Sequence, residues 1–168
     1  MKAVANGEVD ILQLLLDILE ATGSHYCVIG GLAVIAYVEP VVSLDLDLAI
    51  FASDVEKTCR IASEKEIKVE EYEHSIKLSS PKSDLRIQLQ TDSRFQEFIS
   101  RGSSRTVLEY RMNVASLEDV LRGKIWAYLD ESRRKSKRQK DLADIARLVE
   151  GYPALATQLP PSLRSQVE

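Results

Sequence analysis

The sequence is poor in the residues that build disulfide frameworks, thiolate or imidazole metal sites, and membrane spans. Its 168 residues include two cysteines, two histidines and one tryptophan. Cys27 and Cys59 fit no metal-ligand spacing, so we expect two buried thiols rather than a redox pair. No apolar run approaches the roughly 18 residues of a transmembrane helix, and the N-terminus lacks a basic segment followed by an apolar one. We therefore expect a cytoplasmic protein without a signal peptide or a membrane span.

An excess of charge of one sign is also missing. With 22 lysines and arginines against 26 aspartates and glutamates, the net charge is −4. The chain therefore has no global attraction for nucleic acid, and any polyanion must be held by a local basic patch. The composition, 45% hydrophobic and 29% charged, is typical of a soluble domain with a real core. We expect one domain over residues 1–168, with a sheet-bearing core at about 8–115 and a helical part at about 116–168.

Hydrophobic periodicity predicts helices and short strands that follow one another along the chain. The predicted helices cover 8–22, 31–37, 54–65, a segment after Asp92, a segment from Ser116, and 138–149. The predicted strands cover 26–29, 44–50, 67–72, 75–79 and 84–90, with an extended piece at 105–114 and one short helix in the tail. This order indicates an α+β fold in which helices flank a small mixed sheet and a helical pair follows at the C-terminus.

The segment from Tyr26 to Ile50 contains a pair of acidic residues in a strand pattern. Side chains alternate along a strand, so Asp45 and Asp47 share one face while the intervening leucines face the core. The two carboxylates lie roughly 7 Å apart and repel each other unless a cation lies between them. Mg²⁺ is a suitable cation, because it binds one or two carboxylates and completes its shell with water and phosphate oxygens.

A pair of glycines precedes this strand. Gly30 and Gly31 end the first predicted strand and open a short helix, whose free backbone N–H groups would attract a phosphate. Taken alone, a diglycine is usually a turn and an alternating aspartate pair is usually a solvated strand edge. Together, in this order and at this spacing, they are a much more specific signal of a functional site.

This arrangement resembles the signature of the nucleotidyltransferase superfamily typified by DNA polymerase beta. The resemblance rests on the diglycine, the short helix and the SLDLD segment that begins at Ser43. It implies that Gly30 and Gly31 face the triphosphate of an NTP, and that Asp45 and Asp47 are the catalytic pair that binds Mg²⁺. Ser43 stands where the superfamily often has threonine and would contribute to nucleotide binding.

The strand at 84–90 departs from the family pattern. In active relatives this neighbouring strand supplies a third carboxylate, whereas here its polar face carries Arg86 and Gln88 at the centre. Asp84 and Asp92 keep the same phase but lie at the strand ends, and either would reach the metal only if the register placed it opposite the aspartate pair. Alternatively, the guanidinium of Arg86 partly replaces the metal, which would give a site that binds nucleotide without transferring it.

Two basic features follow in the C-terminal half. Lys124 falls on the apolar stripe of its helix, where a lysine either extends its ammonium group to solvent or reaches a phosphate in a cleft. Six cations lie within the eight positions 133–140, which form either a solvated connection or a surface for phosphates.

The C-terminal half carries a second resemblance. The SLEDVLRGKIWAY segment, the basic run and the KDLADIARLVE segment, which begins at Lys140, resemble bacterial nucleotidyltransferase-like proteins of the AbiEii/AbiGii toxin type. The two resemblances together cover residues 24–150.

The leading hypothesis is transfer of a nucleoside monophosphate from Mg-NTP to a hydroxyl of RNA, protein or a small molecule. Lys124 and Lys140 are its candidate phosphate partners. The resemblance implies a bacterial toxin–antitoxin or phage-defence system with a cognate toxin or antitoxin partner. Two alternatives stay open: a degenerate module that binds nucleotide or a partner without turnover, and a structural domain whose aspartates are simply exposed.

Overall fold

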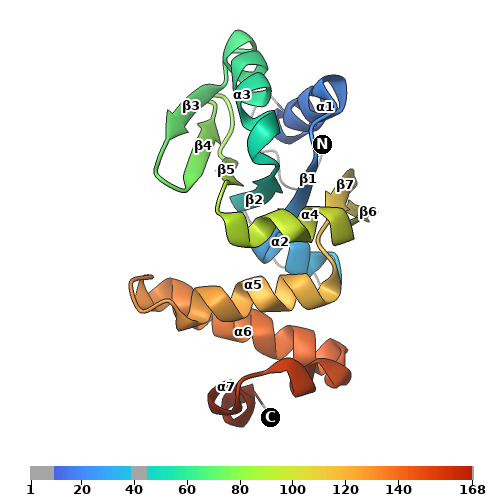
Figure 1. The fold of residues 1–168 in the computed structure, drawn as a ribbon, viewed down its shortest axis with the longest axis vertical. Helices are drawn as coiled ribbons and strands as arrows, with labels where there is room; N and C mark the ends of the chain where they lie inside the picture. Colours follow the sequence, from blue (N-terminus) through green and yellow to red (C-terminus); the bar gives the residue numbers. More distant parts are fainter. Residues whose placement is uncertain (1–9, 39–44, 168) are drawn as a thin grey trace.

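A seven-stranded sheet with helices on both sides makes up the computed structural model, which describes residues 10–38 and 45–167 (Figure 1). The strands, whose spatial order is β3-β4-β5-β2-β1-β7-β6, are β1 Tyr26–Ile29, β2 Asp45–Ile50, β3 Lys68–Glu71, β4 Ser75–Ser79, β5 Arg86–Gln90, β6 Ser103–Val107 and β7 Tyr110–Val114. The pairs β2–β5 and β1–β7 are parallel and the other pairs are antiparallel. The predicted α+β fold with a mixed sheet is confirmed.

Helices lie on both sides of the sheet-bearing part and continue below it. They are α1 Ile11–Thr22, α2 Gly30–Ile35, α3 Val55–Glu64, α4 Gln96–Arg101, α5 Leu117–Leu129, α6 Lys135–Gly151 and α7 Pro161–Val167. Short 3₁₀ helices cover Ala52–Asp54 (η1), Ser93–Phe95 (η2) and Pro153–Gln158 (η3). Helices α2 and α4 lie between the sheet and α5, and α5 packs along α6 as the predicted C-terminal pair (Figure 1). None of the helices in the described ranges is both long enough and apolar enough to cross a membrane.

The alternation predicted for β2 is present. Leu46 and Leu48 are fully buried, whereas Asp45 and Asp47 are half-buried on the opposite face. Strand β5 alternates in the same way, with Ile87 buried between polar neighbours. The apolar face packs into the core that α1 and α3 also fill, which leaves the polar face of β2 and β5 for a site. Both cysteines are free and buried, as predicted.

Three segments differ from the sequence-based prediction. The piece at 105–114 is a hairpin of two strands, because Leu108 and Glu109 both adopt positive φ, as type I′ turns require. These residue types carry no turn signal. The tail holds η3 and α7 rather than a single short helix. Helix α6 begins at Lys135 rather than at 138, so much of the basic run is helical, although cations in a first turn oppose the helix dipole.

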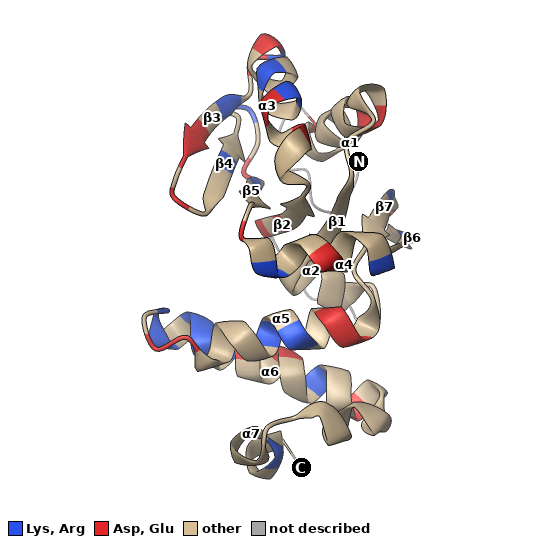
Figure 2. Cartoon of the chain, viewed as in Figure 1, with Lys and Arg blue, Asp and Glu red and all other residues tan. Residues whose placement is uncertain are grey.

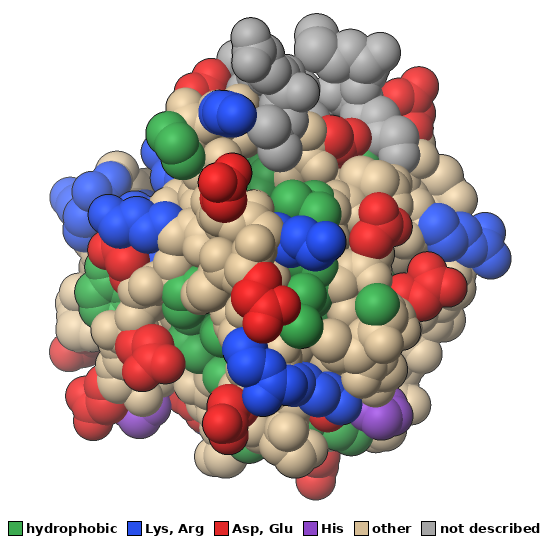
Figure 3. Space-filling model, turned by 90° about the horizontal axis from the view of Figure 1, so that it is seen from above, with side chains coloured by type: hydrophobic (Ala, Val, Ile, Leu, Met, Phe, Trp, Pro, Cys, Tyr) green, Lys and Arg blue, Asp and Glu red, His purple; other side chains and the backbone are tan. Residues whose placement is uncertain are grey.

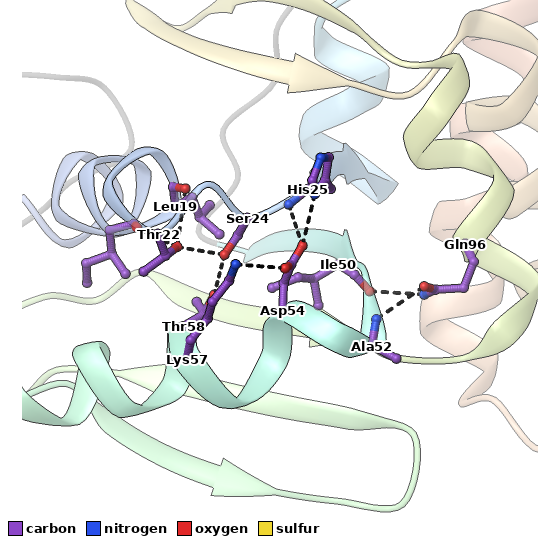
Figure 4. Close-up of polar contacts among 11 residues, drawn as sticks. Leu19, Thr22, Ser24, His25, Ile50, Ala52, Asp54, Lys57, Thr58 and Gln96 are labelled. Carbon is purple, nitrogen blue, oxygen red and sulfur yellow. Dashed lines mark hydrogen bonds and ion pairs between the residues drawn. The ribbon is translucent and has the colours of Figure 1, made fainter.

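A polar network ties β1 to β2 at the end of these strands that lies away from the aspartate pair (Figure 4). Asp54 accepts the backbone N–H of His25 at 2.7 Å and contacts the ammonium group of Lys57 at 3.0 Å. Gln96 donates to the carbonyl of Ile50 at 3.0 Å and accepts the N–H of Ala52 at 3.3 Å. Because the register of β1 against β2 is fixed here, Ile29 lies opposite Asp47 at the other end.

The face above α1 and α3 has no surface of one charge. Seen from that side, Lys and Arg side chains alternate with Asp and Glu side chains and with hydrophobic ones (Figure 3). A polyanion would therefore find no basic patch among the described residues seen on this face. Figure 2 shows Lys and Arg gathered at the connection from α5 to α6 and in the first turns of α6.

Candidate functional site

A cleft of about 770 Å³ lies between the polar face of the sheet and the α5–α6 pair. From strands β2 and β5 and from the hairpin of β3 and β4, its lining includes Asp45, Asp47, Tyr72, Lys77, Arg86 and Gln88. From the helices it includes Lys124, Arg133, Arg134, Lys137, Lys140 and Asp141. Among the described lining residues, seven lysines and arginines accompany three aspartates, so this part of the cleft is positive in a chain whose net charge is negative.

Asp45 is held by the strand beside it. The parallel register places Asp45 opposite Arg86 and Asp47 opposite Gln88. Arg86 Nε donates to Asp45 Oδ1 at 2.6 Å, and this hydrogen bond raises the pKa of the guanidinium further. The centre of β5 therefore supplies a cation where active relatives of the superfamily are expected to supply a carboxylate.

Asp47 stands in the opposite situation. No hydrogen bond or ion pair reaches its side chain within the described part of the chain. Burial raises its pKa to about 6, against the opposing effect of the Lys124 ammonium, and the charge of Asp45 raises it further. The cleft thus holds a carboxylate that accepts from no donor in residues 10–38 and 45–167, which is the kind of acceptor that a bound cation would satisfy.

Gly30 is needed to place this carboxylate. Its φ is +71°, and a Cβ atom built on it would lie 2.7 Å from Asp47 Oδ2. Any other residue would be strained there and would push Asp47 out of position. Gly31, the next residue, lines the cleft itself. The two glycines therefore have different roles. Gly30 allows the close approach of Asp47, and Gly31 exposes its backbone to the cleft.

The donor set fits Mg²⁺ only together with a phosphate ligand. Residues 10–38 and 45–167 contain no group of three His, Cys, Asp or Glu side chains placed to hold a metal. Two carboxylates with oxygen donors from phosphate and water are nevertheless a common magnesium environment. Arg86 would have to share Asp45 in that state. Asp84 and Asp92 do not lie opposite the aspartate pair, and Asp92 instead accepts the N–H of Arg94 at 2.9 Å where η2 begins.

Lys124 is a buried cation between two buried carboxylates. Its Nζ lies 3.1 Å from Asp141 Oδ1 and 2.9 Å from Asp144 Oδ2, so the ammonium group bridges α5 and α6. A lysine on an apolar helix face needs such counter-ions, because an unpaired charge would be strongly destabilising there. The residue also lines the cleft. Its predicted contact with a phosphate stays a prediction, and its contact with the two aspartates is a finding.

The basic run divides into structural and exposed members. Arg133 Nε donates to Asp141 Oδ2 at 2.7 Å, and Arg138 Nε donates to the carbonyl of Tyr128 at 2.7 Å. The first contact joins the connection before α6 to α6 itself, and the second joins α6 to α5. By contrast, the exposed residues Arg134, Lys137 and Lys140 line the cleft, so the run is more than a solvated connection.

The structure brings together most of the predicted site. Gly31, Asp45, Asp47, Lys124 and Lys140 line one cleft, with Gly30 directly behind Asp47. Ser43 lies outside the described residues.

Other cleft residues were missed by sequence reasoning. Asp141 was identifiable as an acidic residue among the apolar positions of its helix, next to Lys140 in the KD pair. Tyr72 and Lys77 belong to the hairpin of β3 and β4, and no sequence signal pointed to either.

Several solved structures have a similar fold. The antibiotic-resistance factor ANT(2″)-Ia, solved with adenylyl-2″-tobramycin, matches with a TM-score of 0.65 at 14% identity and covers 94% of each chain. The lincosamide antibiotic adenylyltransferase LnuA, solved with lincomycin, matches with a TM-score of 0.57 at 14% identity, over 85% of this chain and 99% of that one. A nucleotidyltransferase-like protein from Paracoccidioides brasiliensis gives 0.58 at 18% identity, over 94% and 90%. The fold is that of the nucleotidyltransferases.

A family model narrows this class. The model described as nucleotidyl transferase AbiEii toxin, type IV toxin–antitoxin system, matches residues 13–165. The chain therefore belongs to the AbiEii nucleotidyltransferase family, which confirms the family resemblance found in the sequence. No curated protein matches the chain in sequence.

Proposed function

We propose that this protein transfers a nucleoside monophosphate from Mg-NTP to a hydroxyl group of an acceptor that is RNA, a protein or a small molecule. The observation that carries the proposal is the cleft, in which Asp45 and Asp47 lie together with the cations of α6, and Asp47 has no hydrogen-bond or ion-pair partner among the described residues. Phosphoryl-type transfers depend mainly on positioning and charge neutralisation, and this arrangement offers both.

Each group has a defined task in this proposal. Asp45 and Asp47 would hold Mg²⁺, which when bound would neutralise charge on the phosphate oxygens. The exposed cations Arg134, Lys137 and Lys140 would bind the same phosphates from the opposite wall of the cleft. The buried ion pairs of Lys124 keep α6 in place, so that these cations stay turned toward the sheet.

The family description names a type IV toxin–antitoxin system, which suggests a biological role for this activity. We propose that the chain is the toxin half of a toxin–antitoxin pair, so that its partner is a cognate antitoxin. Induced expression of the protein alone should then slow bacterial growth, and Asp45→Asn with Asp47→Asn should restore growth at equal protein level. Growth inhibition by the double variant equal to that by the wild type would contradict a toxic activity at this cleft.

One observation favours a second candidate, a module that binds nucleotide without turnover. The hydrogen bond from Arg86 to Asp45 occupies one carboxylate, and Gln88 stands beside the other. The chain therefore lacks a third carboxylate at the centre of β5. A base for the attacking hydroxyl would then be missing, although the phosphates could still bind.

A labelling experiment separates the two candidates. Radiolabelled NTPs are offered with total RNA and cell protein as acceptors to the wild type, Asp45→Asn, Asp84→Asn, Asp92→Asn and Gln88→Asp, with Gln90→Asp as the control for an added charge. Labelling by the wild type that is lost in Asp45→Asn supports the transferase, and labelling that survives Asp84→Asn and Asp92→Asn excludes those residues as the base. Labelling gained only in Gln88→Asp, or none at all while Mg-NTP binds, favours the binding module.

A further inference from the structure

The hairpin of β3 and β4 places an exposed aromatic ring at the cleft. Among the described residues, Tyr72, Leu129 and Tyr152 are the large hydrophobic side chains with exposed surfaces, at 57%, 48% and 38%. Tyr72 is the one of these three that lines the cleft. Its backbone N–H donates to the carbonyl of Ser75 at 2.8 Å, which closes the turn that carries it. The turn thus presents an aromatic ring to a cleft whose described lining is mainly polar and charged, with Ile87 as the other large hydrophobic residue.

The register of the strands places this ring at a defined separation from the aspartate pair. Asp47 lies opposite Gln88, Gln88 opposite Lys77, and Lys77 opposite Glu70. Neighbouring strands lie about 4.8 Å apart, so Glu70 stands roughly 14 Å from Asp47 across the face of the sheet. Tyr72 Oη donates to Glu70 Oε2 at 3.2 Å, which orients the ring beside that end of the row. The ribose and base of a nucleotide extend over a comparable length from its phosphates.

The charges along this row give a bound nucleotide one direction. The phosphates are attracted to the end of the cleft where Arg134 and Lys137 lie with the aspartate pair, which would hold the proposed metal. The hairpin turn is acidic, with Glu71 and Glu73 on either side of Tyr72, and it repels phosphate. Between the two ends, Gln88 Nε2 donates to Ser75 Oγ at 3.1 Å, and Lys77 is the one charged residue of the row between Asp47 and Glu70. A nucleotide with its phosphates on the cations therefore extends its base toward the hairpin.

We propose that Tyr72 stacks on the base of the bound nucleoside triphosphate and that the β3–β4 hairpin is the nucleobase subsite. This inference rests on the function proposed above and adds the residue that contacts the base. Every base has a π face, so a tyrosine ring improves affinity for all four nucleotides. The hydroxyl group of Tyr72 serves to orient the ring against Glu70, and the contact with the base is made by the ring itself.

The test compares ligands with and without a base. Affinities of the four Mg-NTPs and of Mg-tripolyphosphate are measured by calorimetry for the wild type, Tyr72→Ala and Tyr72→Phe. Leu129→Ala is the matched control, because it removes a similarly exposed hydrophobic side chain outside the cleft. Tyr72→Ala should weaken Mg-NTP binding roughly 5- to 150-fold, the equivalent of about 1–3 kcal/mol of base–aromatic stacking. Binding of tripolyphosphate should not change, and Tyr72→Phe and Leu129→Ala should bind NTP nearly as well as the wild type.

Each contrary result has its own meaning. Equal weakening of NTP and tripolyphosphate binding in Tyr72→Ala would overturn the base contact, since the effect would then lie in the phosphate site or in the fold. Unchanged NTP affinity in Tyr72→Ala overturns the inference while the proposed function stands, and a loss of transfer at unchanged affinity would assign the ring to the acceptor. If the wild type binds no Mg-NTP, the proposed function fails and this inference fails with it.

Discussion

Asp47 lies on β2 and Asp54 lies just after it, but the two carboxylates differ in their hydrogen-bond partners and in the direction of their pKa shifts. Asp54, 5% exposed, accepts the N–H of His25 and contacts Lys57. Burial raises its pKa, but these donors outweigh burial and hold the pKa below its usual value. Asp47 has no such partner in the described part of the chain, and burial raises its pKa to about 6.

The difference separates a structural carboxylate from a functional one. Hydrogen bonds to a buried charge offset the free energy needed to remove that charge from water. A buried charge that lacks such bonds lowers the stability of the fold. Gly30, whose missing side chain leaves room for the Asp47 carboxylate, shows that the fold accommodates the unsatisfied group closely. A carboxylate that lowers stability, yet has space made for it by a glycine, is best explained as a group that binds a ligand in the cleft.

The largest expected effect is loss of ligand binding at the unsatisfied aspartate. Mg-NTP at a hundred times its Kd should stabilise the wild type by about 2.7 kcal/mol, which raises Tm by roughly 5–10 °C in a chain of this size. Asp45→Asn with Asp47→Asn should abolish this rise, because the metal loses both protein ligands. Thermal unfolding with and without Mg-NTP measures it, and a double variant that is folded yet still shows the full rise would contradict the metal site.

The next effect concerns the satisfied aspartate. Asp54→Asn should lower the free energy of unfolding by about 2 kcal/mol at pH 7, because an amide cannot serve both His25 and Lys57 as an acceptor. A lowered folded pKa gives stability that is present above the usual carboxyl pKa and is lost as the pH falls through the folded value. The gap between wild type and variant should therefore shrink below about pH 4. Urea unfolding at several pH values measures it.

Glu56→Gln provides the control for this change, since Glu56 is an exposed carboxylate in the first turn of α3, two residues after Asp54. It should alter stability by less than about 0.5 kcal/mol. A difference between Asp54→Asn and the wild type that stayed constant from pH 7 to pH 3 would show that the amide fails for steric reasons rather than through loss of charge.

Much of the fold was predictable because its elements have strong local patterns. Strand β1 has the predicted bounds, and β2 shows the predicted alternation of aspartate and leucine. The hairpin of β6 and β7 was missed since Leu108 and Glu109 carry the positive φ values that glycine or asparagine usually supplies. The early start of α6 was missed because the cations at Lys135 and Lys137 oppose the helix dipole in a first turn, so no local pattern favours a helix there.

The site was predictable only where one strand or one turn carries it. The spacing of Asp45 and Asp47 gave their common face, and the residue types of β5 showed that Arg86 and Gln88 replace a carboxylate. The partners of Lys124 could not be predicted, because Asp141 and Asp144 lie on another helix and their approach depends on how α5 packs on α6. Tyr72 reaches the cleft through the pairing of three strands, which is a tertiary property.

A smaller effect is expected from the exposed cations opposite Asp47. Arg134→Gln with Lys137→Gln should weaken Mg-NTP binding by about 1 kcal/mol at low salt, which is roughly fivefold, since exposed charge contacts contribute little individually. The loss should diminish with added salt because screening already weakens these contacts. Lys135→Gln is the matched control, as Lys135 is equally exposed in the same run but does not line the cleft. Calorimetric titrations at several salt concentrations measure both, and equal effects of the two changes would remove the special role of the cleft-lining cations.

The smallest expected effect compares the two aspartates of the cleft without any ligand. Asp47→Asn should raise the free energy of unfolding by roughly 0.5 kcal/mol at pH 7, because it removes a half-buried charge that has no partner in the described residues. Asp45→Asn should not do so, since it removes the acceptor of Arg86; that exposed pair contributes between about 0 and 1 kcal/mol. If the two variants change the free energy of unfolding in opposite directions, the Asp47 carboxylate lowers stability when no ligand is bound. A destabilised Asp47→Asn variant would mean instead that this carboxylate supports the fold, and Asp47 would then belong with Asp54 as a structural residue.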